Sequence, residues 1–212
     1  MEAFKILEGI AAPLEMANVD TGQILPARFL RRPRQEGFQD FLFRDMRFDE
    51  AGQELPSFIL NRPPYRATSI LVADRNFGAG SSREQAAWAL VDFGIRCVIA
   101  EDFGDIFHAN AFKAGLLPVR LDLAICRKLR EQLAAVPGRQ LRIDLPAQHV
   151  TAPDGSVYPF EVDAFRKRCL VEGLDDIGLT LQYDTTITAF EQAYRQRFDW
   201  LFRSHPNAPT GG

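Results

Sequence analysis

The sequence is poor in the residues that build metal sites and disulfide frameworks. It contains three cysteines and three histidines. The cysteines Cys97, Cys126 and Cys169 are far apart, no CxxC pair occurs, and the histidines are equally scattered. An odd number of dispersed cysteines argues against a disulfide framework. Their spacing matches none of the compact iron–sulfur runs. We therefore expect that this chain binds no metal and no cluster by itself.

The sequence also lacks long apolar runs and a strong excess of one charge. No run of about 18 apolar residues is present to span a membrane, and the first residues lack the charged-then-apolar order of a signal peptide. The formal net charge is -3, whereas proteins that bind nucleic acid usually carry a basic patch. We expect a cytoplasmic protein that binds neither a membrane nor nucleic acid.

What the sequence does contain is typical of a compact globular chain. Its 212 residues suit one large domain, and 46% of them are hydrophobic, which is an ordinary fraction. We expect a single domain over residues 1–203. The remaining residues 204–212 are rich in proline and glycine, so they are expected to form a disordered tail.

The stretch 76–94, NFGAGSSREQAAWALVDFG, predicts a strand end, a turn and a helix. It follows the apolar run 69–73 and turns on Gly78 and Gly80, because glycine allows positive φ and a close approach of a ligand to the backbone. Ser81 is followed three residues later by an acidic residue, Glu84, which is the pattern of a capping box. This pattern predicts that the helix begins at Ser81.

The residue types of this turn favour an anion. A helix N-terminus offers free N–H groups and the positive end of the helix dipole. Arg83 adds a guanidinium that grips a carboxylate through two parallel hydrogen bonds. Both features would also make the Ser81 hydroxyl easier to ionise. Residue types alone leave a simpler interpretation open, in which Ser81 is only a helix cap and Arg83 is a surface charge.

The same stretch resembles the NFGxGSSREHA signature of the aconitase swivelling domain, most closely that of the small subunit of 3-isopropylmalate dehydratase. The resemblance implies that Ser81 is the catalytic base. It also implies that Ser82 and Arg83 bind the substrate and stabilise the serine alkoxide, while Gly78 and Gly80 support the site. The sequence departs from the signature where Gln85 replaces the histidine.

A second motif precedes this stretch. Residues 18–26, NVDTGQILP, have the composition of a surface loop that ends at Pro26. They resemble the NxDTDxIxP motif of the same family, which implies that Asp20 and Thr21 lie beside the active site. The second aspartate of that motif is Gly22 here. The two departures from the family motifs, at Gly22 and Gln85, indicate a different substrate or an altered activity.

Residues 27–66 form an arginine-rich segment with little predicted secondary structure. A cluster of basic residues is usually a solvated face, and a long irregular segment inside a domain is usually functional or bound to a partner. The resemblance implies that this segment reaches the active site, where Arg31 or Arg32 would bind a substrate carboxylate. The aromatic part, residues 38–48, is expected to pack against the domain or the partner. The basic cluster comprises Arg28, Arg31, Arg32 and Arg34.

The rest of the chain alternates strand and helix patterns. Strands are expected at 97–100 and 116–121, then at 140–145, 148–152 and 157–162. Helices are expected at 105–115, 122–135, 163–171 and 185–202. This alternation predicts an α/β fold with a mainly parallel central sheet. The resemblance, which extends to 102–115 and to 173–181, implies an aconitase-like swivelling domain with β/β/α layers.

The resemblance also implies an activity and a partner. The small subunit would act with a large subunit of 3-isopropylmalate dehydratase that holds a [4Fe-4S] cluster. The pair would isomerise a dicarboxylate through isopropylmaleate in leucine biosynthesis. Two alternatives stay open: a paralogous hydro-lyase for a related diacid such as dimethylmaleate or citraconate, and a non-catalytic partner of a large subunit.

Overall fold

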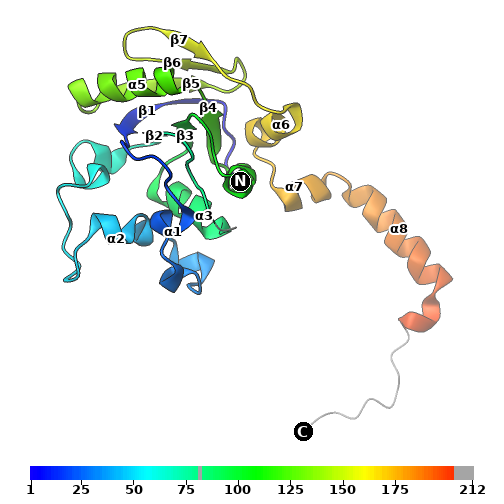
Figure 1. Cartoon of the computed structure of the whole chain (residues 1–212). Coiled ribbons are helices and arrows are strands. Elements are labelled where there is room, and N and C mark those ends of the chain that lie inside the picture. Colours follow the sequence, from blue (N-terminus) through cyan, green and yellow to red (C-terminus); the bar gives the residue numbers. More distant parts are fainter. Residues whose placement is uncertain (81–82, 203–212) are drawn as a thin grey trace. The chain divides into compact units, whose positions relative to one another are not determined.

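The computed structural model describes residues 1–80 and 83–202 (Figure 1). By its contacts the chain divides into two compact units, Met1–Asp175 and Asp176–Gly212. The predicted disordered tail, 204–212, lies outside the described residues. We propose that residues 1–203 act as one functional domain.

The first unit is built on a seven-stranded sheet with the order β4-β3-β2-β1-β5-β6-β7. Strands β1 to β4 are parallel to one another. Strand β5 pairs antiparallel with β1, and β6 and β7 continue the antiparallel part. The predicted α/β class is confirmed, and the sheet is mixed, because the predicted parallel part is only one half of it. The strands are β1 Ile6–Pro13, β2 Ile70–Val72, β3 Cys97–Ala100, β4 Leu117–Arg120, β5 Gln140–Asp144, β6 His149–Thr151 and β7 Val157–Pro159.

Helices cover both faces of this sheet, as Figure 1 shows for α3 and α5. Side chains of a strand alternate between faces, so Leu71 joins one hydrophobic cluster whereas Ile70 and Val72 join the other. Residues of α3 and α4 contribute to the first cluster, and residues of α5 and α6 to the second. The helices are α1 Thr21–Ile24, α2 Arg44–Arg47, α3 Glu84–Phe93, α4 Asp105–Ala114, α5 Leu123–Ala135 and α6 Ala164–Glu172.

Most predicted element positions are confirmed, including an edge strand that contains Pro118. The predicted helix start at Ser81 is wrong. Helix α3 begins at Glu84, and its N-cap is Arg83, which makes no side-chain capping bond. Ser81 and Ser82 lie outside the described residues. The glycine at the other end, Gly94, has a φ of 105° and closes the helix as predicted.

The arginine-rich segment 27–66 is ordered by buried side chains rather than by long elements. It contains α2 and the short 3-10 helices η1 Ala27–Phe29, η2 Arg34–Glu36, η3 Gln39–Phe41, η4 Ile59–Asn61 and η5 Tyr65–Ala67. Phe38, Leu42 and Phe43 are fully buried in the first cluster. Packing of the 38–48 segment against the domain is therefore confirmed.

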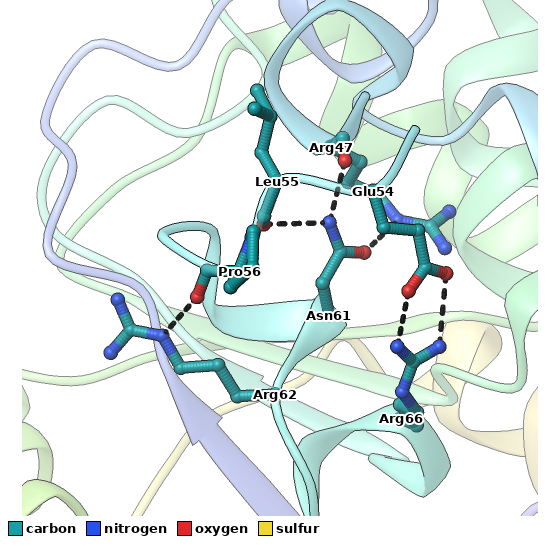
Figure 2. A network of polar contacts seen from close by, with 7 residues as sticks. All are labelled: Arg47, Glu54, Leu55, Pro56, Asn61, Arg62 and Arg66. Carbon is teal, nitrogen blue, oxygen red and sulfur yellow. Dashed lines mark hydrogen bonds and ion pairs between the residues drawn. The ribbon is translucent and has the colours of Figure 1, made fainter. Parts of the chain in front are cut away.

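A polar network holds the turns of this segment together (Figure 2). Arg47 is buried and donates from Nε to Asn61 Oδ1 at 3.1 Å. Asn61 Nδ2 in turn donates to the Arg47 carbonyl at 2.6 Å and to the Leu55 carbonyl at 3.0 Å. Buried polar groups are costly unless they are hydrogen-bonded, and here each of these groups finds a partner.

The second unit is helical. It contains α7 Asp176–Leu181, α8 Asp184–Arg197 and η6 Asp199–Leu201, so the helix predicted over 185–202 ends earlier than expected. Tyr194 packs its ring against Phe190, Phe198 and Phe202. Among the described residues, no helix combines the length and apolar character that crossing a membrane requires.

Candidate active site

Two sequence-distant loops meet at the carboxyl end of β2. Gly78 and Ala79 donate their N–H groups to the Val19 carbonyl at 2.7 and 3.1 Å, and Thr21 donates its own to the Ala79 carbonyl at 2.9 Å. Ligands of α/β sheets usually bind at the carboxyl ends of strands. The two family-like motifs, which lie about 60 residues apart in the chain, are thus brought side by side as the resemblance implies.

A third loop completes this arrangement. Phe77 donates its N–H to the Asp102 carbonyl at 3.1 Å, and Gly104 donates its N–H to the Phe77 carbonyl at 3.0 Å. We call residues 18–25, 76–80 and 102–104 the site frame. The resemblance extends to the last of these loops, but sequence reasoning did not place it at the site. The strand ending at Ala100 was the available signal, because neighbouring parallel strands end at one edge of the sheet.

Asp20 shapes the first loop of the site frame. Its Oδ1 accepts hydrogen bonds from the N–H groups of Gly22 at 2.6 Å and Gln23 at 2.9 Å. The Asp20 N–H donates back to Gln23 Oε1 at 2.9 Å, so the pair forms a capping box for α1. Thr21 is buried. The surface-loop interpretation of this stretch is therefore wrong, because its middle is a capped helical turn with a buried face.

The glycines of the turn are needed for two physical reasons. Gly78 has a φ of 74° and Gly80 a φ of 90°, a region that favours glycine. In addition, a methyl group on Gly78 would lie 2.2 Å from Cγ of Phe107. The predicted turn on these two glycines is confirmed, and Gly78 lets the turn lie directly on α4.

Arg83 emerges from the frame with its guanidinium close to Gly22. Its Nη1 donates to the Leu25 carbonyl at 3.3 Å. A methyl group on Gly22 would lie 3.0 Å from Arg83 Nη1 and 3.0 Å from Asp20 Oδ1. Gly22 therefore leaves the space in which the guanidinium lies, and no carboxylate among the described residues forms an ion pair with Arg83.

The basic cluster of the arginine-rich segment divides into paired and unpaired members. Arg28 forms an ion pair with Asp45, Arg32 with Glu36, and Arg34 with Asp92. Arg31 is exposed, and it has no ion-pair partner in the described part of the chain. Of the two arginines predicted to bind a substrate carboxylate, Arg31 is therefore the one whose guanidinium is not already engaged.

The cysteines do not suit a metal or a cluster. All three are buried, in β3, α5 and α6. Burial raises the pKa of the Cys97 thiol strongly, and it raises that of Cys126 to about 12. A thiolate is the form that binds metal. Within residues 1–80 and 83–202, no three cysteine, histidine or acidic residues are grouped so that they could hold a metal ion.

Comparison with known proteins identifies the family. Residues 1–124 match the Aconitase C-terminal domain, and residues 127–164 match LeuD_N. Residues 176–204 match the C-terminal domain of the 3-isopropylmalate dehydratase small subunit. The chain is therefore matched across both of its compact units.

Individual relatives agree with these domains. A 3-isopropylmalate dehydratase small subunit from Xanthobacter autotrophicus is 50% identical over 201 residues, covering 95% of this chain and 100% of the relative. One from Rhodopseudomonas palustris is 48% identical over 200 residues, covering 94% and 100%. A crystal structure of 3-isopropylmalate dehydratase from Methanocaldococcus jannaschii has a TM-score of 0.61 and 25% identity, covering 88% of this chain and 99% of that one. This chain belongs to the family of 3-isopropylmalate dehydratase small subunits.

Proposed function

We propose that this chain is the small subunit of a 3-isopropylmalate dehydratase, a hydro-lyase of the aconitase family. The enzyme isomerises 2-isopropylmalate and 3-isopropylmalate through isopropylmaleate in leucine biosynthesis. The observation that carries the proposal is the position of Arg83. Its guanidinium lies at the site frame without a carboxylate partner among the described residues, and it directly follows Ser81 and Ser82 in the chain.

In this proposal Ser81 is the base and then the acid. Its oxygen takes a proton from the carbon next to a substrate carboxylate, and the electron pair of that C–H bond forms the double bond as hydroxide leaves the adjacent carbon. The serine then returns its proton to the carbon that lost hydroxide, and hydroxide adds to the other carbon, so the elements of water that left are restored. Arg83 binds a substrate carboxylate as a planar bidentate donor, and its positive charge favours the ionised serine.

The remaining residues have supporting roles in this proposal. Ser82 donates a hydrogen bond to the substrate, and Asp20 and Thr21 fix the first loop of the site frame. Gly78 and Gly80 let the turn reach the substrate. Arg31 is the candidate for the second substrate carboxylate, because Arg32 is paired with Glu36.

The reaction needs a partner. The described residues of this chain do not fit an iron–sulfur cluster, so we propose that a [4Fe-4S] cluster resides in the large subunit, where it would supply Lewis-acid chemistry at the leaving hydroxyl. In this proposal the chain itself transfers the proton and binds the substrate carboxylates. We also propose that the complex works in the cytoplasm.

The test is hydration of isopropylmaleate in an anaerobic mixture of this chain and a cluster-loaded large subunit. The chain alone and the large subunit alone serve as controls. We expect turnover only in the mixture. A stable complex without turnover of any diacid would contradict the proposal.

One observation favours a second function, a paralogous hydro-lyase for a related diacid. Gly22 stands where the family motif has an aspartate, and a side chain there would touch Arg83. The electrostatic surroundings of Arg83 therefore differ from those that the motif implies. Running dimethylmaleate and citraconate beside isopropylmaleate separates the two functions, because the larger kcat/KM identifies the substrate.

A further inference from the structure

A pocket lies between α4, the end of β4 and residues 159–166, which lead from the end of β7 into α6. It has a volume of about 600 Å³, within the range of small-molecule sites. Its polar lining contains Arg120, Arg166 and His108, together with Glu161 and Asp163. Its apolar lining comes from Phe112, Pro118, Pro159, Phe160 and Val162.

The two guanidiniums of this pocket have no carboxylate partners in the described part of the chain. Arg166 Nη1 lies 3.1 Å from His108 Nδ1, and its guanidinium lies over the Phe112 ring at 5.0 Å from the centroid. Arg120 is exposed and forms no ion pair with a described residue. The guanidinium of Arg166 is thus held in place by neutral partners, which leaves its charge available to a ligand.

His108 is the neutral member of this group. Burial, followed by the charges of Arg120 and Arg166, lowers the pKa of its imidazole to about 4, while Asp105 acts in the opposite direction. A neutral imidazole accepts the Arg166 N–H at Nδ1 and keeps its own proton on Nε2. Because His108 is neutral, it adds no third positive charge beside Arg120 and Arg166.

The acidic residues of the lining limit the kind of anion. Oδ1 of Asp163 accepts the N–H groups of Phe165 at 3.1 Å and Arg166 at 3.0 Å, so this carboxylate caps α6. Glu161 is exposed and forms no ion pair with a described residue. One carboxylate can pair with both guanidiniums, whereas a second carboxylate on the same ligand would find no further cation in this lining and would be repelled by Glu161.

We propose that this pocket binds a small organic monocarboxylate with an apolar body. The carboxylate pairs with Arg120 and Arg166, and the apolar body packs on Phe112 and Phe160. Binding pairs two guanidiniums that form no ion pair with a described residue. No site-frame residue lines this pocket, although the His108 ring packs beside Phe103 of the frame with 5.8 Å between the ring centroids. The proposal does not depend on the proposed function.

The test is calorimetric titration of the full chain with 4-methylpentanoate, with 4-methylpentan-1-ol and inorganic phosphate as comparison ligands. We expect saturable one-to-one binding of the carboxylate alone. Arg120→Gln and Arg166→Gln should each weaken it at least tenfold. Arg127→Gln, which removes an exposed charge on α5 outside the pocket, should not change it. Circular dichroism of each variant separates loss of binding from loss of folding.

Two further variants test the role of the lining charges and the independence of this pocket from the candidate active site. Glu161→Gln should strengthen binding a few-fold, because it removes a competing carboxylate. Arg83→Gln should leave binding unchanged, which separates this pocket from the candidate active site. Equal binding of the alcohol, binding of phosphate alone, absence of saturable binding, or loss of binding on addition of the large subunit would each overturn the proposal.

Discussion

The site frame and the arginine-rich segment are both irregular, but they are held in different ways. The site frame is joined by backbone hydrogen bonds, such as those from Gly78 and Ala79 to the Val19 carbonyl. The arginine-rich segment is joined by side chains, above all by Arg47 and Asn61 (Figure 2). The frame therefore depends chiefly on backbone geometry and on its glycines, with side-chain bonds from Asp20 and between Asn76 and Asn18 in addition. The segment depends on particular buried polar side chains.

The largest loss of stability is expected from Gly78→Ala, a change in the site frame. Alanine at a φ of 74° is strained, and its methyl group would lie 2.2 Å from Phe107 Cγ. We expect a loss of about 3 kcal/mol in the free energy of unfolding, measured by urea denaturation, from both strain and overpacking. Gly155→Ala is the matched control, because Gly155 has a φ of 82° and open space around it. It should cost about 1 kcal/mol. Equal costs would show that Phe107 does not restrict the turn.

The second loss of stability is expected in the arginine-rich segment, where Arg47→Met removes a buried donor. This change keeps the apolar length of the side chain but leaves Asn61 Oδ1 and the Leu42 carbonyl without their donor. Unsatisfied buried acceptors are costly, so we expect a loss of about 3 kcal/mol in the free energy of unfolding. Arg66→Met is the control. It removes the exposed pair with Glu54, and its urea midpoint should stay at the wild-type value. A similar loss in both variants would contradict the role given to burial.

A smaller effect is expected where the frame meets Arg83. In Gly22→Ala the methyl group would lie 3.0 Å from Arg83 Nη1, so the guanidinium must move. We expect kcat/KM to fall about tenfold, or about 1.4 kcal/mol, in the reconstituted enzyme. Gly22→Asp should lose less, because its carboxylate can pair with Arg83. Gln23→Ala, which removes only half of the capping box, should retain most of the activity. An unchanged kcat/KM in Gly22→Ala would show that Arg83 is not held at this position.

A pH dependence of stability is expected from His108, with no effect at neutral pH. The pKa of this imidazole is about 4 in the folded chain, below its ordinary value near 6.5. The neutral form therefore favours folding above about pH 6.5, and this contribution is lost as the pH falls from about 6.5 to about 4. In His108→Gln, the urea midpoint should change less with pH over that window than it does in the wild type. His149→Gln, at an exposed histidine of β6, should follow the wild type. Parallel curves for wild type and His108→Gln would refute the prediction.

Much of the fold could be predicted from the sequence because local signals agreed with the final packing. The run 97–100 became β3, and Gly94 and Gly115 end their helices in the left-handed conformation. The helix start was wrong because a serine followed three residues later by glutamate is a local pattern, whereas Arg83 is held at the N-cap while its side chain contacts Leu25. The buried network of Arg47 could not be predicted, because it joins residues whose spacing carries no periodic signal.

The candidate site was predictable only through the resemblance. Residue types predicted an anion near Ser81 and Arg83, but the meeting of residues 18–25 with 76–80 depends on the parallel pairing of β1 with β2 in the sheet. The importance of Gly22 for Arg83 likewise became visible only from their distance. The pocket at Arg120 and Arg166 had no signal in the sequence, because its lining comes from α4, β4 and α6.

The central claim is that this chain supplies the proton-transfer group at the site frame. The most direct measurement is the turnover of the reconstituted enzyme with Ser81→Ala, alongside the affinity of the two subunits for each other. The account predicts a loss of at least a thousandfold in kcat with the affinity between subunits unchanged. Substantial turnover in Ser81→Ala, with the complex intact, would contradict it.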